Sequence, residues 1–267
     1  MTEIYPYTEV NLHTHFFMCG HATGEASEYV DQALGTRLKV LGFSDHCPLP
    51  DHSYSGSRMD IARLGQYVDY VNEQKERRAR GLKILLGAEC DYRPDLAGFY
   101  RDLGFDYLIC SVHYANSHRY ISYYRNSPDM LHEYTDNYIA ALQSGLFILG
   151  CHPDLFGLFY LDWDAEARSC AKAIIEASQD SGVALEINGY GLRKPLLSTP
   201  GGLRHQYPLN PFWELAAELG GVKTVVNSDA HRPEDIIAKV DEGYEMASRL
   251  GLKVPSLVID NSVISLK

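Results

Sequence analysis

Residues 11–15 read Asn11-Leu12-His13-Thr14-His15, and His21 follows six residues later. The apolar run that ends at Leu12 is typical of a short buried strand. Because His13 and His15 are two positions apart, an extended chain places both imidazoles on the same side. Two imidazoles at the mouth of a strand make half of a tetrahedral metal site. Two unrelated surface histidines are the alternative, and the rest of the chain must decide between them.

The size and charge of the chain limit the possible functions. Its 267 residues, 45% of them hydrophobic, allow one large domain or two small ones. No repeat or linker is evident, so we expect a single domain over residues 1–267. The net charge of −11 argues against a surface for nucleic acid or anionic membrane, but not against an anionic substrate held by metal ions and arginines.

The cysteines and the apolar runs indicate a cytoplasmic location. The six cysteines form no C-x-x-C pair and no secretory signal is evident, so we expect reduced thiols. No apolar run approaches the roughly 18 residues that a membrane span needs.

Apolar runs of strand length alternate with segments of helical periodicity. The expected strands are Val10–Leu12, Leu38–Phe43, Lys83–Gly87, Asp106–Ser111, Leu146–Gly150, Val183–Ile187 and Val222–Asn227. The expected helices are 25–34, 60–80, 95–103, 130–144, 165–181, 211–219 and 233–250, with loops at 47–57 and 114–126 and a short terminal strand at 257–259. This alternation predicts a parallel sheet with right-handed crossovers. An open sheet of this kind would show a Gly-rich phosphate fingerprint, and neither common form is present.

Ligand-type side chains follow six of the seven expected strands. They are His13 and His15, Asp45 and His46, Glu89, His113, His152, and Asp229 and His231. Barrel enzymes place their chemistry at the carboxyl ends of parallel strands, so a barrel of about seven strands would gather these residues at one rim. A solvated Glu89 or a helix-capping Asp229 is reasonable singly. The recurrence along the chain favours a shared site.

The composition of this set favours transition metals. Histidines with one or two carboxylates suit zinc, iron or manganese better than calcium or magnesium. Seven histidines and two carboxylates exceed the needs of one four-coordinate ion and suit two or three, with Glu89 as the candidate bridge. Three thiols lie beside these motifs and are lesser candidates for ligands: Cys19, Cys47 and Cys151. Four histidines lack this placement: His52, His118, His132 and His205.

These motifs resemble the PHP (polymerase and histidinol phosphatase) domain and, within it, the monofunctional histidinol-phosphate phosphatases. The matching pieces, in the family's order, are His13-Thr14-His15, residues 42–46, Gly87-Ala88-Glu89, Ser111-Val112-His113, residues 150–153 and residues 228–231. More specific to this branch are residues 89–92, and Glu186-Ile187-Asn188 followed by residues 191–195. Cys151 stands where relatives commonly have glycine, and the segment Ser198 to Gln206 matches nothing.

The resemblance implies a distorted seven-stranded (β/α) barrel, TIM-like, that holds three divalent ions. By position, the first ion would be bound by His13, His15, Glu89 and Asp229. The second would be bound by His21, His46 and His231, and the third by Glu89, His113 and His152. Glu89 would then bridge the first and third ions.

The resemblance also implies a phosphomonoesterase that hydrolyses L-histidinol phosphate to L-histidinol and phosphate in histidine biosynthesis. A metal-bound hydroxide would attack phosphorus in line, and Asp229 or His231 would protonate the leaving alkoxide. We expect Arg193 to contact the phosphate or the substrate, because a guanidinium matches phosphate bidentately. Arg58 is a second candidate for such a contact, and a surface loop is the alternative for Arg193.

Three other functions are weaker. A phosphatase for another small phosphoester or a nuclease would use the same fold, although the net acidity argues against a nuclease. A metallo-amidohydrolase also begins with H-x-H but lacks the pairing of Asp45-His46 with Asp229-Ala230-His231. A metal-free module for protein binding would have lost ligands, and all nine are present.

Overall fold

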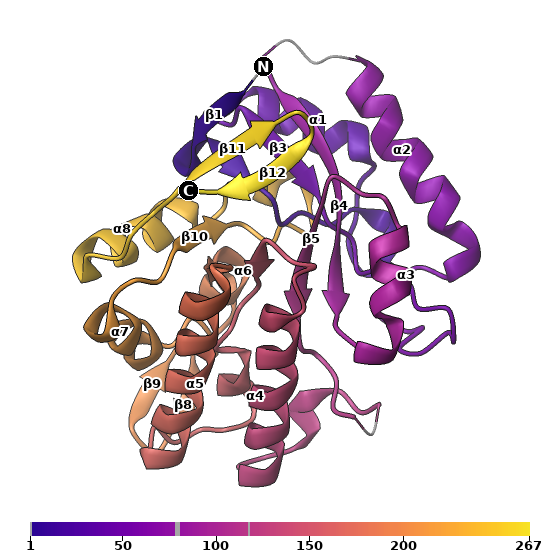
Figure 1. Cartoon of the computed structure of the whole chain (residues 1–267). Helices are drawn as coiled ribbons and strands as arrows, with labels where there is room; N and C mark the ends of the chain where they lie inside the picture. The colour runs from indigo at the N-terminus through magenta and orange to yellow at the C-terminus, as the bar shows by residue number, and fades with distance from the viewer. Residues whose placement is uncertain (1, 78–80, 117) are drawn as a thin grey trace.

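A computed structural model describes residues 2–77, 81–116 and 118–267 (Figure 1). Within these ranges, seven parallel strands form one sheet in the order β10-β7-β6-β5-β4-β3-β2. Their bounds are β2 (Val10–Asn11), β3 (Val40–Phe43), β4 (Lys83–Asp91), β5 (Tyr107–Ser111), β6 (Leu149–Gly150), β7 (Ala184–Asn188) and β10 (Thr224–Asn227). The expected parallel arrangement is confirmed.

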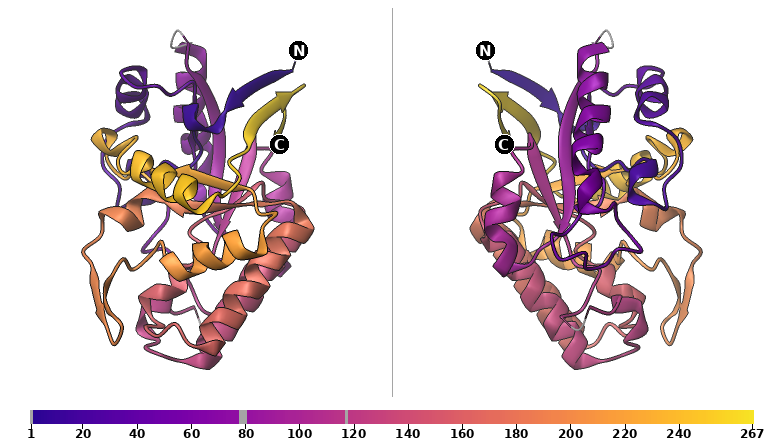
Figure 2. Two further views of the ribbon diagram at one scale, coloured as in Figure 1. Left: turned by 90° about the vertical axis from the view of Figure 1, so that its left-hand side faces the viewer. Right: turned by 90° about the vertical axis from the view of Figure 1, so that its right-hand side faces the viewer.

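Helices connect consecutive strands and cover the outside of the sheet (Figures 1 and 2). The α-helices are α1 (Ala26–Leu34), α2 (Leu64–Arg77), α3 (Ala97–Asp102), α4 (Pro128–Gln143), α5 (Ala165–Ser181), α6 (Gly189–Arg193), α7 (Asn210–Leu219) and α8 (Val240–Leu250). Short 3-10 turns are η1 (Tyr7–Glu9), η2 (Phe17–Cys19), η3 (Ile61–Arg63), η4 (Pro94–Leu96), η5 (Ile121–Tyr123), η6 (Leu155–Leu158) and η7 (Pro233–Asp235). Within the described ranges, no helix is long and apolar enough to cross a membrane.

The sheet curls into a nearly closed barrel, and side chains link its two edges. The gap lies between β2 and β10, where backbone pairing is limited to a single parallel bridge between Thr14 and Ala230 among the described residues. The Asn227 side-chain oxygen accepts hydrogen bonds from the Leu12 amide at 2.9 Å and from the Tyr7 hydroxyl at 3.1 Å. These bonds stand in for ladder bonds that the edges would otherwise lack. The distorted seven-stranded barrel expected from the resemblance is confirmed; the single-domain organisation stays a prediction.

A small antiparallel sheet closes the amino end of the barrel. It has the order β1-β11-β12, formed by β1 (Glu3–Pro6), β11 (Ser256–Asp260) and β12 (Val263–Leu266). Figure 1 shows it at the end opposite the arrowheads of β4 and β5. Its buried Leu257 and Ile264 pack in one cluster with the barrel-interior residues Leu85 and Val225. The carboxyl end is therefore the end left open for a site.

Two elements differ from the sequence prediction because their backbone groups form hydrogen bonds that the sequence does not reveal. The expected strand Lys83–Gly87 continues to Asp91, so Glu89 lies inside a strand rather than after it. The expected loop around Arg193 is the short helix α6. The Asn188 side chain caps α6 by accepting a hydrogen bond from the Gly191 amide.

Two expected helices are broken in ways that periodicity does not reveal, and the unmatched segment has a structure of its own. The expected helix 233–250 is interrupted, since Lys239 has φ of 63° and α8 begins only after it. The expected helix 60–80 begins with η3 and continues as α2 to Arg77; residues 78–80 lie outside the described residues. The unmatched segment Ser198 to Gln206 lies mostly in a hairpin of β8 (Leu197–Thr199) and β9 (Gly202–Arg204).

We predict that Gly87→Ala destabilises the barrel. A Cβ at this position would overlap the ring of Tyr107, whose hydroxyl donates to the carbonyl oxygens of Leu12 at 2.8 Å and Phe43 at 3.2 Å. Overpacking of this kind lowers the free energy of unfolding by about 1–3 kcal/mol. Urea denaturation measures this loss. Gly98→Ala is the control, because α3 has open space there and alanine favours a helix; equal effects of both substitutions would contradict the packing argument.

Candidate metal centre

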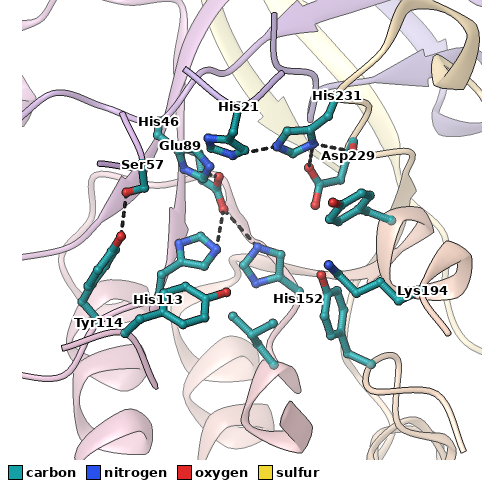
Figure 3. Close-up of a pocket in the computed structure, with 14 residues that line it drawn as sticks. His21, His46, Ser57, Glu89, His113, Tyr114, His152, Lys194, Asp229 and His231 are labelled. Atoms are coloured by element: carbon teal, nitrogen blue, oxygen red, sulfur yellow. Dashed lines mark hydrogen bonds and ion pairs between the residues drawn. The ribbon is translucent and has the colours of Figure 1, made fainter. Parts of the chain in front are cut away.

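The open end of the barrel holds a cavity of about 180 Å³ (Figure 3). Its lining includes seven of the nine expected ligands, together with several tyrosines and one lysine. The full lining is His21, His46, Ser57, Glu89, His113, Tyr114, Tyr120, His152, Leu155, Tyr190, Lys194, Tyr207, Asp229 and His231. The remaining two expected ligands, His13 and His15, are fully buried directly behind this wall.

Glu89 lies at the centre of the cluster. Its carboxylate is 1% exposed, and its amide donates to the carbonyl oxygens of Ser44 and Asp45 on the neighbouring chain segment. One carboxylate oxygen, Oε1, lies 3.0 Å from His152 Nε2 and 3.8 Å from His113 Nε2. The other, Oε2, lies 2.9 Å from His46 Nδ1 and 3.5 Å from the Nε2 atoms of both His13 and His15. Both oxygens therefore face imidazoles from different strand ends.

Asp229 forms the second carboxylate of the cluster. Its backbone has φ of 50°, a left-handed conformation that non-glycine residues adopt at a cost. Its Oδ1 atom lies 3.3 Å from His15 Nε2, 3.5 Å from His13 Nε2 and 3.4 Å from His231 Nδ1. The His231 ring also approaches His21, with 3.1 Å between their Nε2 atoms. The bent backbone thus turns Asp229 toward three imidazoles.

Unpaired buried atoms show that the cluster fits metal ions. The atoms without a hydrogen-bond partner include His13 Nε2, His15 Nε2 and Asp229 Oδ1. His46 Nδ1 and Glu89 Oε2 approach to 2.9 Å but do not have the geometry of a hydrogen bond. Leaving such groups unpaired away from water costs free energy, so they call for another partner. Imidazole nitrogens and carboxylate oxygens are ligands for zinc, iron and manganese. A divalent cation satisfies several of them at once.

Several sets of ligand atoms lie within 4.8 Å of one another, among them His13-His15-Asp229, His13-Glu89-His152, His15-His46-His231 and Cys19-His21-His231. The structure brings all nine expected ligands together, and their division among three ions stays a prediction. One of these sets includes Cys19, which lies beside His21 and His231. All six cysteines are buried free thiols.

Further carboxylates, whose roles the sequence did not reveal, hold the histidines from behind. Asp45 Oδ1 lies 3.5 Å from His15 Nδ1, and Asp91 accepts a hydrogen bond from the His113 amide and lies 3.3 Å from its Nδ1. Glu186 Oε1 lies 2.9 Å from His13 Nδ1. Such partners fix the tautomer and orientation of a metal-binding histidine. The matching residues 42–46, 89–92 and 186–188 already contain all three carboxylates, although the sequence does not indicate this role for them.

Neither expected arginine lines the cavity. Arg58 is 5% exposed and donates to Asp91 Oδ2 at 2.7 Å and to the Cys47 carbonyl oxygen at 2.9 Å. Arg193 donates to the carbonyl oxygens of Ser228 at 2.9 Å and Asp229 at 3.2 Å. Both guanidiniums therefore support segments that carry ligands or their partners. Direct contact of either arginine with substrate stays a prediction.

The cavity wall contains residues that sequence reasoning missed. Lys194 extends its amino group into the pocket beside His152 (Figure 3), with Nζ 4.2 Å from the centre of the Tyr190 ring. Tyr207 contacts His152 edge-on, and Tyr190 stacks on His231. Lys194 belongs to the matching residues 191–195, but nothing in the sequence indicates that it faces a cavity. Tyr207 lies in no motif, so only the folded chain reveals it. Of the four histidines without strand-end placement, none lines this cavity.

Electrostatics divide the histidines into two groups. Burial opposes a charged ring at His13 and His15, but Asp229 and the other carboxylates overcome it, raising the pKa of His13 well above its usual value and that of His15 to about 9. Burial lowers the pKa of His46 to about 3 and that of His231 well below its usual value. In the absence of metal, the rings of His13 and His15 are therefore positively charged at neutral pH. The rings of His46 and His231 are neutral and can bind a metal without losing a proton.

The chain is similar in sequence to a known family and to two known proteins. Residues 11–189 match the PHP domain family. A protein named "Probable histidinol-phosphatase" from Deinococcus radiodurans is 31% identical, over 84% of this chain and 86% of that protein. The histidinol-phosphatase of Bacillus subtilis is 24% identical, over 84% of this chain and 94% of that protein.

A solved structure supports the fold. The histidinol phosphate phosphatase of Lactococcus lactis, in complex with zinc, L-histidinol and phosphate, superimposes with a TM-score of 0.73 at 17% identity. The match covers 97% of this chain and 99% of that chain.

We predict that metal binding releases protons. A ring protonated at about pH 7 must lose its proton before its nitrogen can bind a metal, so zinc added to metal-free protein should release about one proton or more per chain, and zinc affinity should fall as the pH is lowered. A pH indicator in weak buffer measures the release. His132→Gln is the control, because this exposed histidine pairs with Glu166 outside the cavity. Zinc binding without proton release would contradict the assigned charge states.

Proposed function

Because the chain belongs to the PHP domain family, we propose that it is a metal-dependent phosphomonoesterase that hydrolyses L-histidinol phosphate to L-histidinol and phosphate at a trinuclear centre. One observation carries this proposal: nine histidine and carboxylate side chains, with Glu89 at their centre, converge at a small cavity that seven of them line. The names of the relatives in Deinococcus and Bacillus support the reaction, and the Lactococcus complex supports zinc as one suitable metal.

The number of ligands supports more than one ion. Four-coordinate zinc is satisfied by four ligands, and the cluster offers seven histidines and two carboxylates. Glu89 directs its two oxygens toward different histidines, as a bridging carboxylate must. Cations held here would supply Lewis acidity to phosphoryl oxygens and lower the pKa of a coordinated water.

The residues of the chain then bind, orient and shield the substrate. Lys194 provides a positive point charge inside the pocket, which suits a phosphate oxygen. Tyr114, Tyr120 and Tyr207 form an aromatic wall that keeps bulk water from the reacting groups and offers apolar area to an imidazole ring. Asp229 and His231 line the same pocket and are the candidates for passing a proton to the leaving oxygen.

The first experiment measures phosphate release and metal content in the same preparations. Protein loaded with zinc, iron or manganese should hold more than two ions per chain and should hydrolyse L-histidinol phosphate faster than other small phosphoesters. Glu89→Gln keeps the shape of the side chain but removes its charge, so it should lose at least one ion together with turnover. Active protein with a single ion would contradict the trinuclear centre. Equal rates on the whole panel of phosphoesters would contradict the substrate.

The second experiment separates the roles of two neighbouring cations. Lys194→Ala should keep its metals and lose about 10- to 100-fold in kcat/KM, since a charged hydrogen bond contributes about 1.5–3 kcal/mol. Arg193→Ala should instead retain metal less well, because the guanidinium fixes the carbonyl oxygens of Ser228 and Asp229. Steady-state kinetics at measured metal content compare the two variants. Full metal content with a large kinetic loss in Arg193→Ala would return that residue to the substrate site.

A further inference from the structure

Glu186 is a buried carboxylate at which four strand ends meet. It is fully buried in β7 and lies under the metal cluster, inside the barrel. Its Oε1 atom lies 2.9 Å from His13 Nδ1 and accepts a hydrogen bond from Asn227 Nδ2 at 2.8 Å. Its Oε2 atom accepts from the His152 amide at 3.2 Å and from Asn188 Nδ2 at 2.8 Å. The four donors come from the ends of β2, β10, β6 and β7.

Asn188 extends this arrangement to the second carboxylate of the cluster. Its Nδ2 atom donates to Glu186 and also lies 3.1 Å from Asp229 Oδ2. Its Oδ1 atom accepts from the Gly191 amide, so the side chain is held at both ends. Glu186 and Asn188 therefore touch His13 and Asp229, two residues that face each other at 3.5 Å between Nε2 and Oδ1.

The hydrogen bonds decide which atoms remain for a metal. A carboxylate only accepts, so once His13 has given up its extra proton to bind a metal, the bond to Glu186 keeps the remaining proton on Nδ1 and leaves Nε2 free for the ion. That Nε2 atom faces Glu89 and Asp229 and has no hydrogen-bond partner. A carboxylate behind a histidine also makes the imidazole a stronger ligand. Likewise, the bond from Asn188 occupies Asp229 Oδ2 and leaves Oδ1 toward the histidines.

We infer that Glu186 and Asn188 are positioning residues that set the metal affinity of the site formed by His13, His15, Glu89 and Asp229. The inference rests on the proposed metal-dependent function and deepens it. Glu186 also lies close to His13 and Cys151 in an arrangement that would suit a ligand. However, four donors already occupy both of its oxygens, so it acts through His13 rather than on an ion.

The test must distinguish this role from simple packing inside the barrel. Glu186→Gln keeps the volume and loses the charge, so the two donors to one of its oxygens now face an amide NH₂ group. Glu186→Asp keeps the charge and is one methylene shorter. Positioning by an acceptor predicts that metal affinity decreases from Glu to Asp to Gln. Packing alone predicts the opposite order for the two variants, because the shorter Asp leaves a cavity whereas Gln does not.

The measurement is zinc affinity in competition with a chelator, with circular dichroism as a check of folding. Glu186→Gln should lose about 10- to 100-fold in affinity for the most affected ion. Thr224→Val is the matched control: Thr224 is buried in the adjacent strand β10, its hydroxyl has no partner, and valine has nearly the same shape. Its zinc affinity should equal that of the parent protein.

Each outcome decides the question. Weaker zinc binding in the order Glu, Asp, Gln supports positioning. Parent-like affinity in Glu186→Gln, an Asp variant weaker than the Gln variant, or failure of both variants to fold overturns it. Because no substrate is used, the result is separate from the proposed reaction. A parent protein that binds zinc but releases no phosphate from L-histidinol phosphate would refute the reaction and leave the positioning result standing.

Discussion

The burial of Glu89 is the constraint on which the rest of the site depends. A carboxylate that is 1% exposed in the middle of a strand is tolerated only if charged or hydrogen-bonding partners surround it. Burial alone would raise its pKa, but the neighbouring imidazoles, among them the positively charged His13, lower it well below the usual range. Imidazoles therefore surround the anion, and they come from the ends of four strands: β2, β3, β5 and β6. The barrel provides that convergence.

Some of the residues that close the barrel also hold the histidine and carboxylate cluster. β2 and β10 meet mostly through side chains, and Asn227 donates to Glu186 while accepting from Leu12 and Tyr7. The left-handed backbones of His152 and Asp229, with φ of 32° and 50°, lie where strands β6 and β10 end. Conformations of this kind are retained where surrounding contacts hold them, and they are common at functional sites. Here they turn two side chains into the pocket rather than along the strand direction.

Periodicity and spacing predicted the parts of the molecule that repeat. Strands buried on both faces leave apolar runs, so seven strands and the helices between them were recognisable, and ligands at strand ends followed the order of the barrel. Elements set by single contacts were not recognisable. The α6 cap depends on one hydrogen bond from the Gly191 amide to Asn188, and the break before α8 depends on the backbone of Lys239. The sequence predicts that the strand ends at Gly87, before Glu89, because a charged residue usually ends an apolar run. Strand β4 continues through Glu89 because histidines distant in sequence surround its carboxylate.

The two arginines show that a guanidinium near a phosphoester site also has backbone partners, while their contact with substrate stays a prediction. An arginine near a phosphoester site invites the inference of a phosphate clamp, because its geometry fits. A guanidinium has five N–H donors, however. Backbone carbonyl oxygens at the end of a strand or in a turn need hydrogen-bond donors as much as a phosphate does. Arg58 and Arg193 satisfy such oxygens at Cys47, Ser228 and Asp229. The cation on the pocket wall is Lys194, whose amino group lies over the Tyr190 ring and brings one positive charge to the cavity. In this acidic chain the positive potential that an anionic substrate needs is therefore local, made by a few side chains and the cations that the histidines can hold.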